Sequence, residues 1–183
     1  MAAVLDLKIL PLGSGRFGAE VQGIDLARAS AARIDAIKNA WYRHDVLLFR
    51  KQRLTDDDLL SFSRHFGTLD SPPNQGAGRK SPAGYPEIYI VSNVLDEKGE
   101  PIGALGDGEA AWHTDMSYAA QPPDASMLYA LEIPALGDLV LWDNRTTMHR
   151  RDAFDGKARR VMHRTQIKGS GAPRRASVFG VTR

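Results

Sequence analysis

The chain has 183 residues, of which 43% are hydrophobic and 25% charged, and this length is sufficient for a single domain over residues 1–183 with a sizeable core. It contains no cysteine, which excludes disulfides, thiolate metal sites and a cysteine nucleophile, so a bound metal must rely on histidine and carboxylate ligands. No apolar run approaches the length that crosses a bilayer, and no basic region precedes an apolar one at the N-terminus. We therefore expect no membrane partner and a cytoplasmic location.

The net charge of +2 is unevenly distributed along the chain. From Arg145 to Arg183 there are eleven Lys and Arg residues against only Asp152 and Asp155, and the rest of the chain is therefore acidic. A basic segment can bind nucleic acid, but this one lacks interleaved aromatic residues on which bases would stack. We expect a small organic anion as the partner, and no nucleic acid.

The first part of the chain predicts short strands and two helices. Strands are indicated around residues 5–10, over 19–24 and in the apolar segment VLLFR. A helix is predicted from Ser30 to about Arg43, because apolar residues recur there at spacings of three and four. Thr55 and the aspartates after it resemble a capping box, which predicts a second helix that ends at Gly67.

The middle of the chain alternates between loops and strands. After the second helix, residues 71–81 are predicted to form a loop and residues 87–93 a strand. Residues 95–108 are predicted to form another loop, and the chain beyond Gly169 a frayed end.

The segment Trp112-His113-Thr114-Asp115 contains the first candidate metal ligands. Side chains in an extended segment alternate with a period of two, so His113 and Asp115 can face the same side. A further histidine would complete a set of two imidazoles and one carboxylate, which leaves positions open on a non-haem Fe(II). Zinc is the second choice because it prefers a tetrahedral site with more nitrogen or sulfur ligands. This short motif is by itself a weak signal.

A second, longer pattern follows at fixed spacing: WDNRTTMH ends at His149, and RRVMHRT follows it. With these motifs the chain resembles the Fe(II)/2-oxoglutarate-dependent dioxygenases of the taurine dioxygenase and 2,4-dichlorophenoxyacetate dioxygenase type (TauD/TfdA). The resemblance covers nearly the whole chain, because GAEVQGIDL, HDVLLFRKQRLT and FSRHFGTL also match the family pattern.

The resemblance implies a role for five residues. It makes His113, Asp115 and His149 the iron ligands, Arg160 the partner of the distal carboxylate of 2-oxoglutarate, and Arg164 the partner of an anionic group on the substrate. Arginine suits both anions because its planar guanidinium donates two parallel hydrogen bonds. Arg160 and Arg164 lie four residues apart, so on one strand they should point to the same face, and His163 to the other.

The resemblance also implies the fold and the reaction. The expected fold is α+β or mainly β, a double-stranded β-helix (a cupin-like jelly roll) with flanking helices outside the barrel. The cofactor is Fe(II), with 2-oxoglutarate and O2 as cosubstrates, and the reaction is hydroxylation of a sulfonate, sulfate or aryloxyalkanoate with release of succinate. Taurine itself is disfavoured, because Asp70 begins the segment in which the taurine enzymes carry a sulfonate-binding histidine.

The chain departs from the family by being internally shortened near residues 134–138. Relatives carry there a much longer stretch, with a Gly-Gly-Asp-Thr turn whose Thr contacts 2-oxoglutarate, and with further barrel strands. Two interpretations remain open: this sequence lacks a stretch of a longer protein, or the protein is a catalytically inactive, truncated remnant that acts only through association with a partner. A homo-oligomer that covers the open strand edges is possible.

Other residues near the motifs have simpler interpretations. Solvent-exposed basic residues are expected at Arg150, Arg151 and Arg159. Packing or capping histidines are expected at His44 and His65. Core aromatic residues with a hydrogen-bonded indole N–H are expected at Trp112 and Trp142.

Overall fold

The computed structural model describes residues 7–71, 80–105, 110–133, 136–152 and 154–171. Parts of the two predicted loops, the predicted junction at 134–135 and the predicted frayed end from residue 172 lie outside these ranges. Within them, no helix is both long and apolar enough to cross a membrane.

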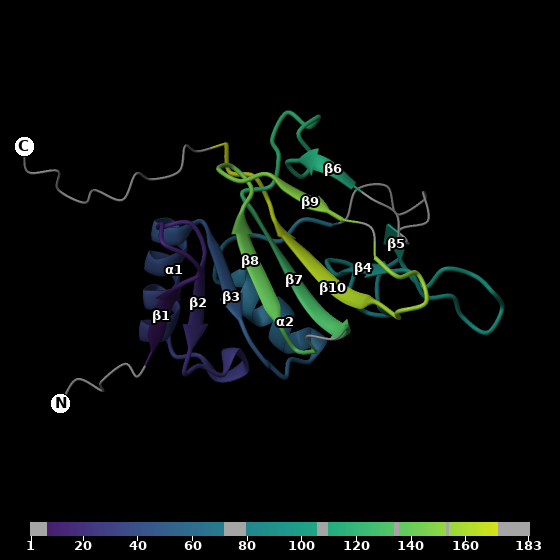
Figure 1. Ribbon diagram of the computed structural model, residues 1–183, viewed down its shortest axis with the longest axis horizontal. Helices are drawn as coiled ribbons and strands as arrows, with labels where there is room; N and C mark the ends of the chain where they lie inside the picture. Colours follow the sequence, from purple (N-terminus) through teal and green to yellow (C-terminus); the bar gives the residue numbers. More distant parts are fainter. Residues whose placement is uncertain (1–6, 72–79, 106–109, 134–135, 153, 172–183) are drawn as a thin grey trace, which may run out of the picture.

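The described residues form a mainly β structure with three helical segments (Figure 1). The helical segments are η1 (Leu26–Arg28), α1 (Ala31–His44) and α2 (Asp56–Arg64). The strands are β1 (Lys8–Pro11), β2 (Ala19–Gln22), β3 (Val46–Phe49), β4 (Tyr89–Ser92), β5 (Ala104–Leu105), β6 (Ala110–His113), β7 (Ala125–Glu132), β8 (Leu139–Asp143), β9 (His149–Arg151) and β10 (Val161–Ile167).

Eight strands form one large sheet in the order β1-β2-β3-β8-β7-β10-β4-β5, and β6 and β9 form a separate two-stranded ribbon. In Figure 1, α2 lies behind the central strands of the sheet, whereas β9 and β6 lie near the upper ends of these strands. The prediction of a mainly β fold with flanking helices is therefore confirmed. A ribbon of two strands facing a sheet of eight covers the sheet only in part, so the closed double-stranded β-helix stays a prediction.

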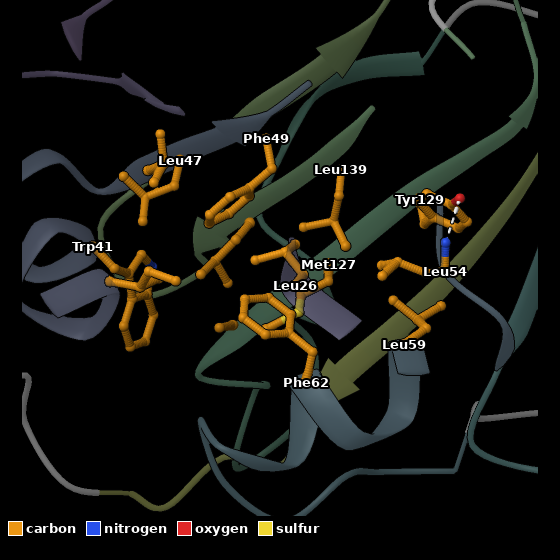
Figure 2. Close-up of a cluster of buried hydrophobic side chains, with 14 of the residues drawn as sticks. Leu26, Trp41, Leu47, Phe49, Leu54, Leu59, Phe62, Met127, Tyr129 and Leu139 are labelled. Carbon is orange, nitrogen blue, oxygen red and sulfur yellow. Dashed lines mark hydrogen bonds between the residues drawn. The ribbon is translucent and has the colours of Figure 1, made fainter. Parts of the chain in front are cut away.

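The two predicted helices are present and cover one face of the sheet. Ile34, Ile37 and Trp41 of α1 are buried, as their helical spacing predicts. Phe62 of α2 contacts Phe49 of β3 edge to face, with ring centroids 5.8 Å apart. Figure 2 shows these rings inside the main cluster of buried hydrophobic side chains, which unites the helices with β3, β7 and β8.

Helix α2 begins with the predicted capping box. The Thr55 hydroxyl accepts a hydrogen bond from the Asp58 backbone N–H at 3.2 Å, and the Asp58 carboxylate accepts one from the Thr55 backbone N–H at 2.9 Å. These bonds satisfy backbone donors that a helix start otherwise leaves unpaired. The helix then ends at Arg64, three residues before the predicted Gly67.

Strands β7 and β8 form an antiparallel hairpin at the predicted junction. Gly137 adopts φ of +80°, and a Cβ atom at this position would lie 2.4 Å from the Gln52 carbonyl oxygen, so only glycine allows this close approach. Asp138 follows and binds the Arg50 guanidinium at 2.6 Å. The hairpin end is thereby fixed to the segment after β3.

One predicted loop contains a short strand. Residues 95–108 were expected to be irregular, but β5 pairs in parallel with β4. Gly103 permits this, because a Cβ atom there would lie 2.6 Å from the Ile90 carbonyl oxygen. The sequence contains no apolar alternation over this stretch, so the strand follows from its pairing with β4 and not from a local pattern.

Strand β10 separates the two faces of the sheet. His163 points toward α2, where its Nδ1 atom lies 2.6 Å from the Asp56 carboxylate, and Thr165 contacts Ser63 of the same helix. Arg164 between them points to the other face, toward the ribbon. The predicted opposite directions of His163 and Arg164 are therefore confirmed.

Candidate metal centre

His113, Asp115 and His149 lie together at the end of the ribbon. One potential ligand atom from each residue lies within 4.8 Å of the others. The Asp115 Oδ1 atom is 3.9 Å from His113 Nε2 and 3.7 Å from His149 Nε2. Ligands that share one ion at about 2.1 Å lie roughly 3–4 Å apart, so this spacing fits a common ion. Two imidazoles and one carboxylate are the donor set typical of non-haem Fe(II).

The ribbon brings the two histidines together although 35 residues separate them in the sequence. His113 of β6 and His149 of β9 are directly paired in the antiparallel register. Side chains that face each other across two strands lie close, and the ring centroids are 4.3 Å apart.

The backbone that positions Asp115 differs from the predicted extended strand. Strand β6 ends at His113, and Asp115 lies in the turn that follows, next to Met116 with φ of +51°. The buried Asn144 side chain holds this turn: it accepts from the Asp115 backbone N–H at 2.9 Å and donates to the Asp115 carbonyl at 3.0 Å. Asn144 also donates to the Pro123 carbonyl at 3.0 Å. The carboxylate is therefore positioned by this clamp and not by strand alternation.

The ring nitrogens of the histidines are oriented for metal binding. His113 donates from Nδ1 to the Ala111 carbonyl at 2.8 Å, which leaves the Nε2 lone pair directed at the centre. Burial lowers the pKa of His149, the Asp115 carboxylate opposes this effect, and His113 and Arg164 add to it. The neutral imidazole, which is the form that binds metals, is favoured at His149.

Arg164 contacts a metal-ligand candidate directly. Its Nη2 atom lies 2.5 Å from Asp115 Oδ2, and the Ser126 hydroxyl donates to the same oxygen at 3.0 Å. These contacts fix the carboxylate, while Asp115 Oδ1 faces the histidines. The guanidinium carbon lies 5.7 Å from the centroid of the Trp142 ring and 5.9 Å from that of Tyr89. Arg164 is thus held at the metal centre by both charge and aromatic contacts.

Arg160 lies directly before β10, and its backbone N–H donates to Asn93 at 2.9 Å. Its side chain lines a cavity of about 210 Å³, together with Arg164, His113 and His149. Burial lowers the pKa of Arg160, and the charge of Arg151 lowers it further. A half-buried guanidinium beside another cation is a favourable position for a bound anion.

Unpaired hydrogen-bond donors are concentrated around the metal centre. Among the described residues, five that line two cavities beside the triad carry a buried side-chain nitrogen without a hydrogen-bond partner: Trp142 Nε1, His149 Nδ1, Arg160 Nη1, Arg164 Nε and Gln166 Nε2. Buried polar atoms are nearly always paired in folded proteins. Such a concentration of unpaired donors indicates a place where anionic ligands complete the hydrogen bonding.

The tryptophans differ from their predicted roles. Trp142 is buried beside His149, but its N–H has no partner within the described part of the chain. Trp112 is 59% exposed, with the Arg150 guanidinium 5.3 Å from its ring centroid, so it is not a core residue. The ribbon, which pairs with no other strand among the described residues, leaves Trp112 uncovered.

The remaining charged residues largely follow their simpler interpretations. Arg159 is exposed and binds Glu132 at 2.7 Å, and Arg150 pairs with Asp152 at 3.1 Å. His44 caps a neighbouring loop through a 2.6 Å contact between its Nδ1 atom and the Arg16 carbonyl. Arg151 is the exception, because it lines the cavity that contains Arg160.

The sequence analysis did not identify Asn144, Ser126 or Gln166 as site residues. Asn144 lies inside the motif WDNRTTMH, which could have marked it. Ser126 and Gln166 belong to ordinary strand segments, and only the register of β7 and β10, which pairs them, brings them beside the triad. No local pattern in the sequence distinguishes these two residues.

Comparison with known proteins agrees with the geometry. The family model described as taurine catabolism dioxygenase TauD, TfdA family, matches residues 8–137 and 135–166. Pentalenolactone F synthase from Streptomyces avermitilis is 35% identical over 75% of this chain and 44% of its own length. An alpha-ketoglutarate-dependent sulfate ester dioxygenase from Pseudomonas putida is 31% identical over 76% of this chain and 42% of its own.

The fold has solved counterparts as well. A putative alpha-ketoglutarate-dependent taurine dioxygenase from Burkholderia xenovorans superposes with a TM-score of 0.71, at 23% identity, over 89% of this chain and 90% of the other. The chain spans about half the length of the curated relatives that it matches. By its two matched stretches and its His-Asp-His centre, the chain belongs to the TauD/TfdA family of Fe(II)/2-oxoglutarate-dependent dioxygenases.

Proposed function

We propose that the protein is a dioxygenase that holds Fe(II) with His113, Asp115 and His149 and hydroxylates a small anionic substrate at the expense of 2-oxoglutarate. The observation that carries this proposal is the convergence of the three ligand atoms next to two cavities lined by unpaired donors. The donor set fits iron, and the cavities fit two organic anions. When bound, the iron supplies the activation of O2 that is coupled to decarboxylation of 2-oxoglutarate to succinate and carbon dioxide.

The residues of the chain have separate tasks in this scheme. Arg160 binds the distal carboxylate of 2-oxoglutarate in the 210 Å³ cavity, where Leu128 and Val91 form an apolar wall that excludes water. Arg164 holds the anionic group of the substrate while it keeps Asp115 in place. A bidentate contact with Arg160 fixes 2-oxoglutarate in one orientation, and the contact with Arg164 orients the substrate, which is the principal requirement for selective attack on one C–H bond.

The proposed substrate is a sulfonate, a sulfate ester or an aryloxyalkanoate. Relatives named as dioxygenases for sulfate esters and for (S)-phenoxypropionate support this range. Such substrates share an oxyanion and a C–H bond next to a heteroatom. Hydroxylation of that carbon gives an unstable product, which breaks down and releases the heteroatom group.

The shortening of the chain is proposed to lie at the β7–β8 hairpin. The two stretches that match the family model meet at residues 135–137, at the end of this hairpin. The family's 2-oxoglutarate-binding Thr then belongs to the stretch that this chain lacks. This loss of one hydrogen bond is the strongest argument for the alternative, an inactive remnant that acts through a partner.

Anaerobic titration with Fe(II) and 2-oxoglutarate separates the two functions. The dioxygenase is expected to develop the visible metal-to-ligand charge-transfer band of the chelate, and Asp115→Ala to lose it. Succinate release is then measured with alkanesulfonates, alkyl sulfates and aryloxyacetates. A folded chain that gives neither the band nor succinate is the remnant.

A further inference from the structure

The second cavity beside the triad contains a donor to which the proposed function assigns no task. The Gln166 residue is only 7% exposed, and its Nε2 atom has no hydrogen-bond partner among the described residues. The same side chain lines a cavity of about 160 Å³ together with Arg164, Asp115 and His113. An unpaired amide N–H on a buried side chain that lines a cavity beside a candidate metal centre can bind a ligand there after a small rotation of the side chain.

Strand register fixes Gln166 on the same face as Arg164. The two residues are two apart in β10, and Thr165 between them turns away to contact Ser63 of α2. Gln166 is paired with Ser126 of β7, which donates to the Asp115 carboxylate. Gln166 therefore cannot turn to the helix face without breaking the pairing that holds β7 and β10 together.

Arg164 alone offers only part of its guanidinium to a substrate. Its Nη2 atom is bound to Asp115, whereas its Nε atom is buried without a partner within the described part of the chain. Gln166 adds a second, uncharged donor to the same cavity. An anion with two or three oxygens can accept from Arg164 and Gln166 together, while Asp115 keeps its bond to Arg164.

We propose that Gln166 is the second donor for the oxyanion head group of the substrate, and that this head group occupies the 160 Å³ cavity next to Arg164. This inference rests on the proposed function. The cavity is smaller than the roughly 300–1,000 Å³ typical of sites that enclose a whole drug-sized ligand, so it takes the head group only. Tyr118 at the cavity is 75% exposed, and the organic part of the substrate extends past its ring. The site thus selects the head group and tolerates variation in the tail.

The test measures binding of two small probes, methanesulfonate and acetate, to the full chain loaded with Mn(II) and 2-oxoglutarate. Calorimetric titration is expected to show binding of at least one probe and not of acetamide, which lacks the charge. Gln166→Met keeps the side-chain length but removes the amide, and is expected to weaken probe binding by roughly tenfold or more, the effect of losing one hydrogen bond to a charged group. Gln166→Glu is expected to abolish it, because a carboxylate repels the anion.

Two controls separate a binding role from a structural one. Gln22→Met makes the same chemical change on an exposed part of β2 and is expected to leave probe binding unchanged. Affinities for Mn(II) and 2-oxoglutarate should stay within about twofold in Gln166→Met, since the residue contacts neither in the proposed arrangement. Wild-type probe affinity in Gln166→Met, or a parallel loss of metal affinity, overturns the proposal.

The same titration without metal distinguishes the failure of this proposal from failure of the proposed function. Arg164 and Gln166 need no metal to be in place, so the probes should still bind weakly to the metal-free chain, and Gln166→Met should still reduce their affinity. Loss of the 2-oxoglutarate chelate with retained, Gln166-dependent anion binding contradicts only the dioxygenase. A chelate that forms normally, together with probe binding that Gln166→Met leaves unchanged, contradicts only the role of Gln166.

Discussion

The two faces of the eight-stranded sheet differ in how completely their polar atoms are paired. On the face toward α2, the Ser63 hydroxyl, His163 and the Tyr129 hydroxyl all have hydrogen-bond partners inside the core or at its edge. On the face toward the ribbon, unpaired nitrogens of Arg160, Arg164 and other residues surround the metal ligands. Stability therefore depends mainly on the first face, and ligand binding on the second. Mutations on the two faces should separate these properties.

The largest effect is expected from His113→Ala on the ribbon face. Removal of one of three ligands should eliminate metal binding and succinate formation, while the free energy of unfolding changes little, since the side chain is 44% exposed. Bound iron per chain and succinate release check this. The control His65→Ala changes an exposed histidine at the end of α2 and should retain full activity. Metal-dependent turnover in His113→Ala contradicts the ligand assignment.

Phe62→Ala on the helix face should have the opposite effect: it should lower stability and leave metal binding intact. Phe62 is buried against Phe49 and Phe66, so its truncation should lower the free energy of unfolding by about 3–5 kcal/mol. Metal affinity per folded molecule should not change. Urea denaturation measures the first quantity and metal titration the second. Phe17→Ala, at a 61% exposed position, should cost less than about 0.5 kcal/mol, and equal losses for both variants would disprove the core assignment.

Arg160→Met should weaken 2-oxoglutarate binding by roughly 10- to 100-fold, because it removes charge-assisted hydrogen bonds from a half-buried site. Metal affinity in the absence of 2-oxoglutarate should remain that of the wild type. The charge-transfer titration gives both constants. Arg159→Met is the matched control, because Arg159 is the neighbouring residue and its guanidinium is exposed and paired with Glu132. If both variants bind 2-oxoglutarate equally well, Arg160 does not contact it.

Asn144→Ala tests the clamp that positions Asp115. Loss of two hydrogen bonds to the turn and of one to Pro123 should reduce metal affinity by about tenfold, as is typical when the support of a ligand is removed. Asn39→Ala, on the exposed side of α1, should change neither metal affinity nor activity. Unchanged metal affinity in Asn144→Ala would mean that the turn holds Asp115 without the clamp.

The smallest effect is expected at the start of α2. Thr55→Ala should cost about 1 kcal/mol by removing the capping box. Hydrogen bonds from Thr55 lower the pKa of Asp58, so their contribution is present above the unfolded pKa and is lost as the pH falls through the lower folded pKa. Asp58→Asn should therefore flatten the decline in stability between about pH 6 and pH 3. Asp35→Asn on α1 serves as the control, and an unaltered acid decline in Asp58→Asn would contradict this linkage.

Local patterns were sufficient for much of the fold. The helix from residue 31 to 44 follows from the spacing of its apolar side chains, and the capping box follows from Thr55 and Asp58. Both signals depend on residues within four positions of each other, where helical geometry alone decides the contacts. The opposite directions of His163 and Arg164 follow in the same way from the period of a strand.

The chemistry of the centre was also contained in the sequence. His113, Asp115, His149, Arg160 and Arg164 were identified from their motifs, and the structure brings all five around two adjoining cavities. Without cysteine, only imidazole and carboxylate groups were available as ligands. The family resemblance thus gave the five candidate residues, and residue type limited the possible ligands to imidazole and carboxylate groups.

Only the tertiary structure decided which residues hold the candidate ligands in position. Asp115 lies in a turn that Asn144 holds from 29 positions away, and Gln166 reaches the centre because β10 pairs with β7. Trp112 was expected in the core but is exposed, because the ribbon that carries it pairs with no other described strand. Strand register and hydrogen bonds between distant segments depend on the packing of the whole chain, and no short stretch of sequence encodes them.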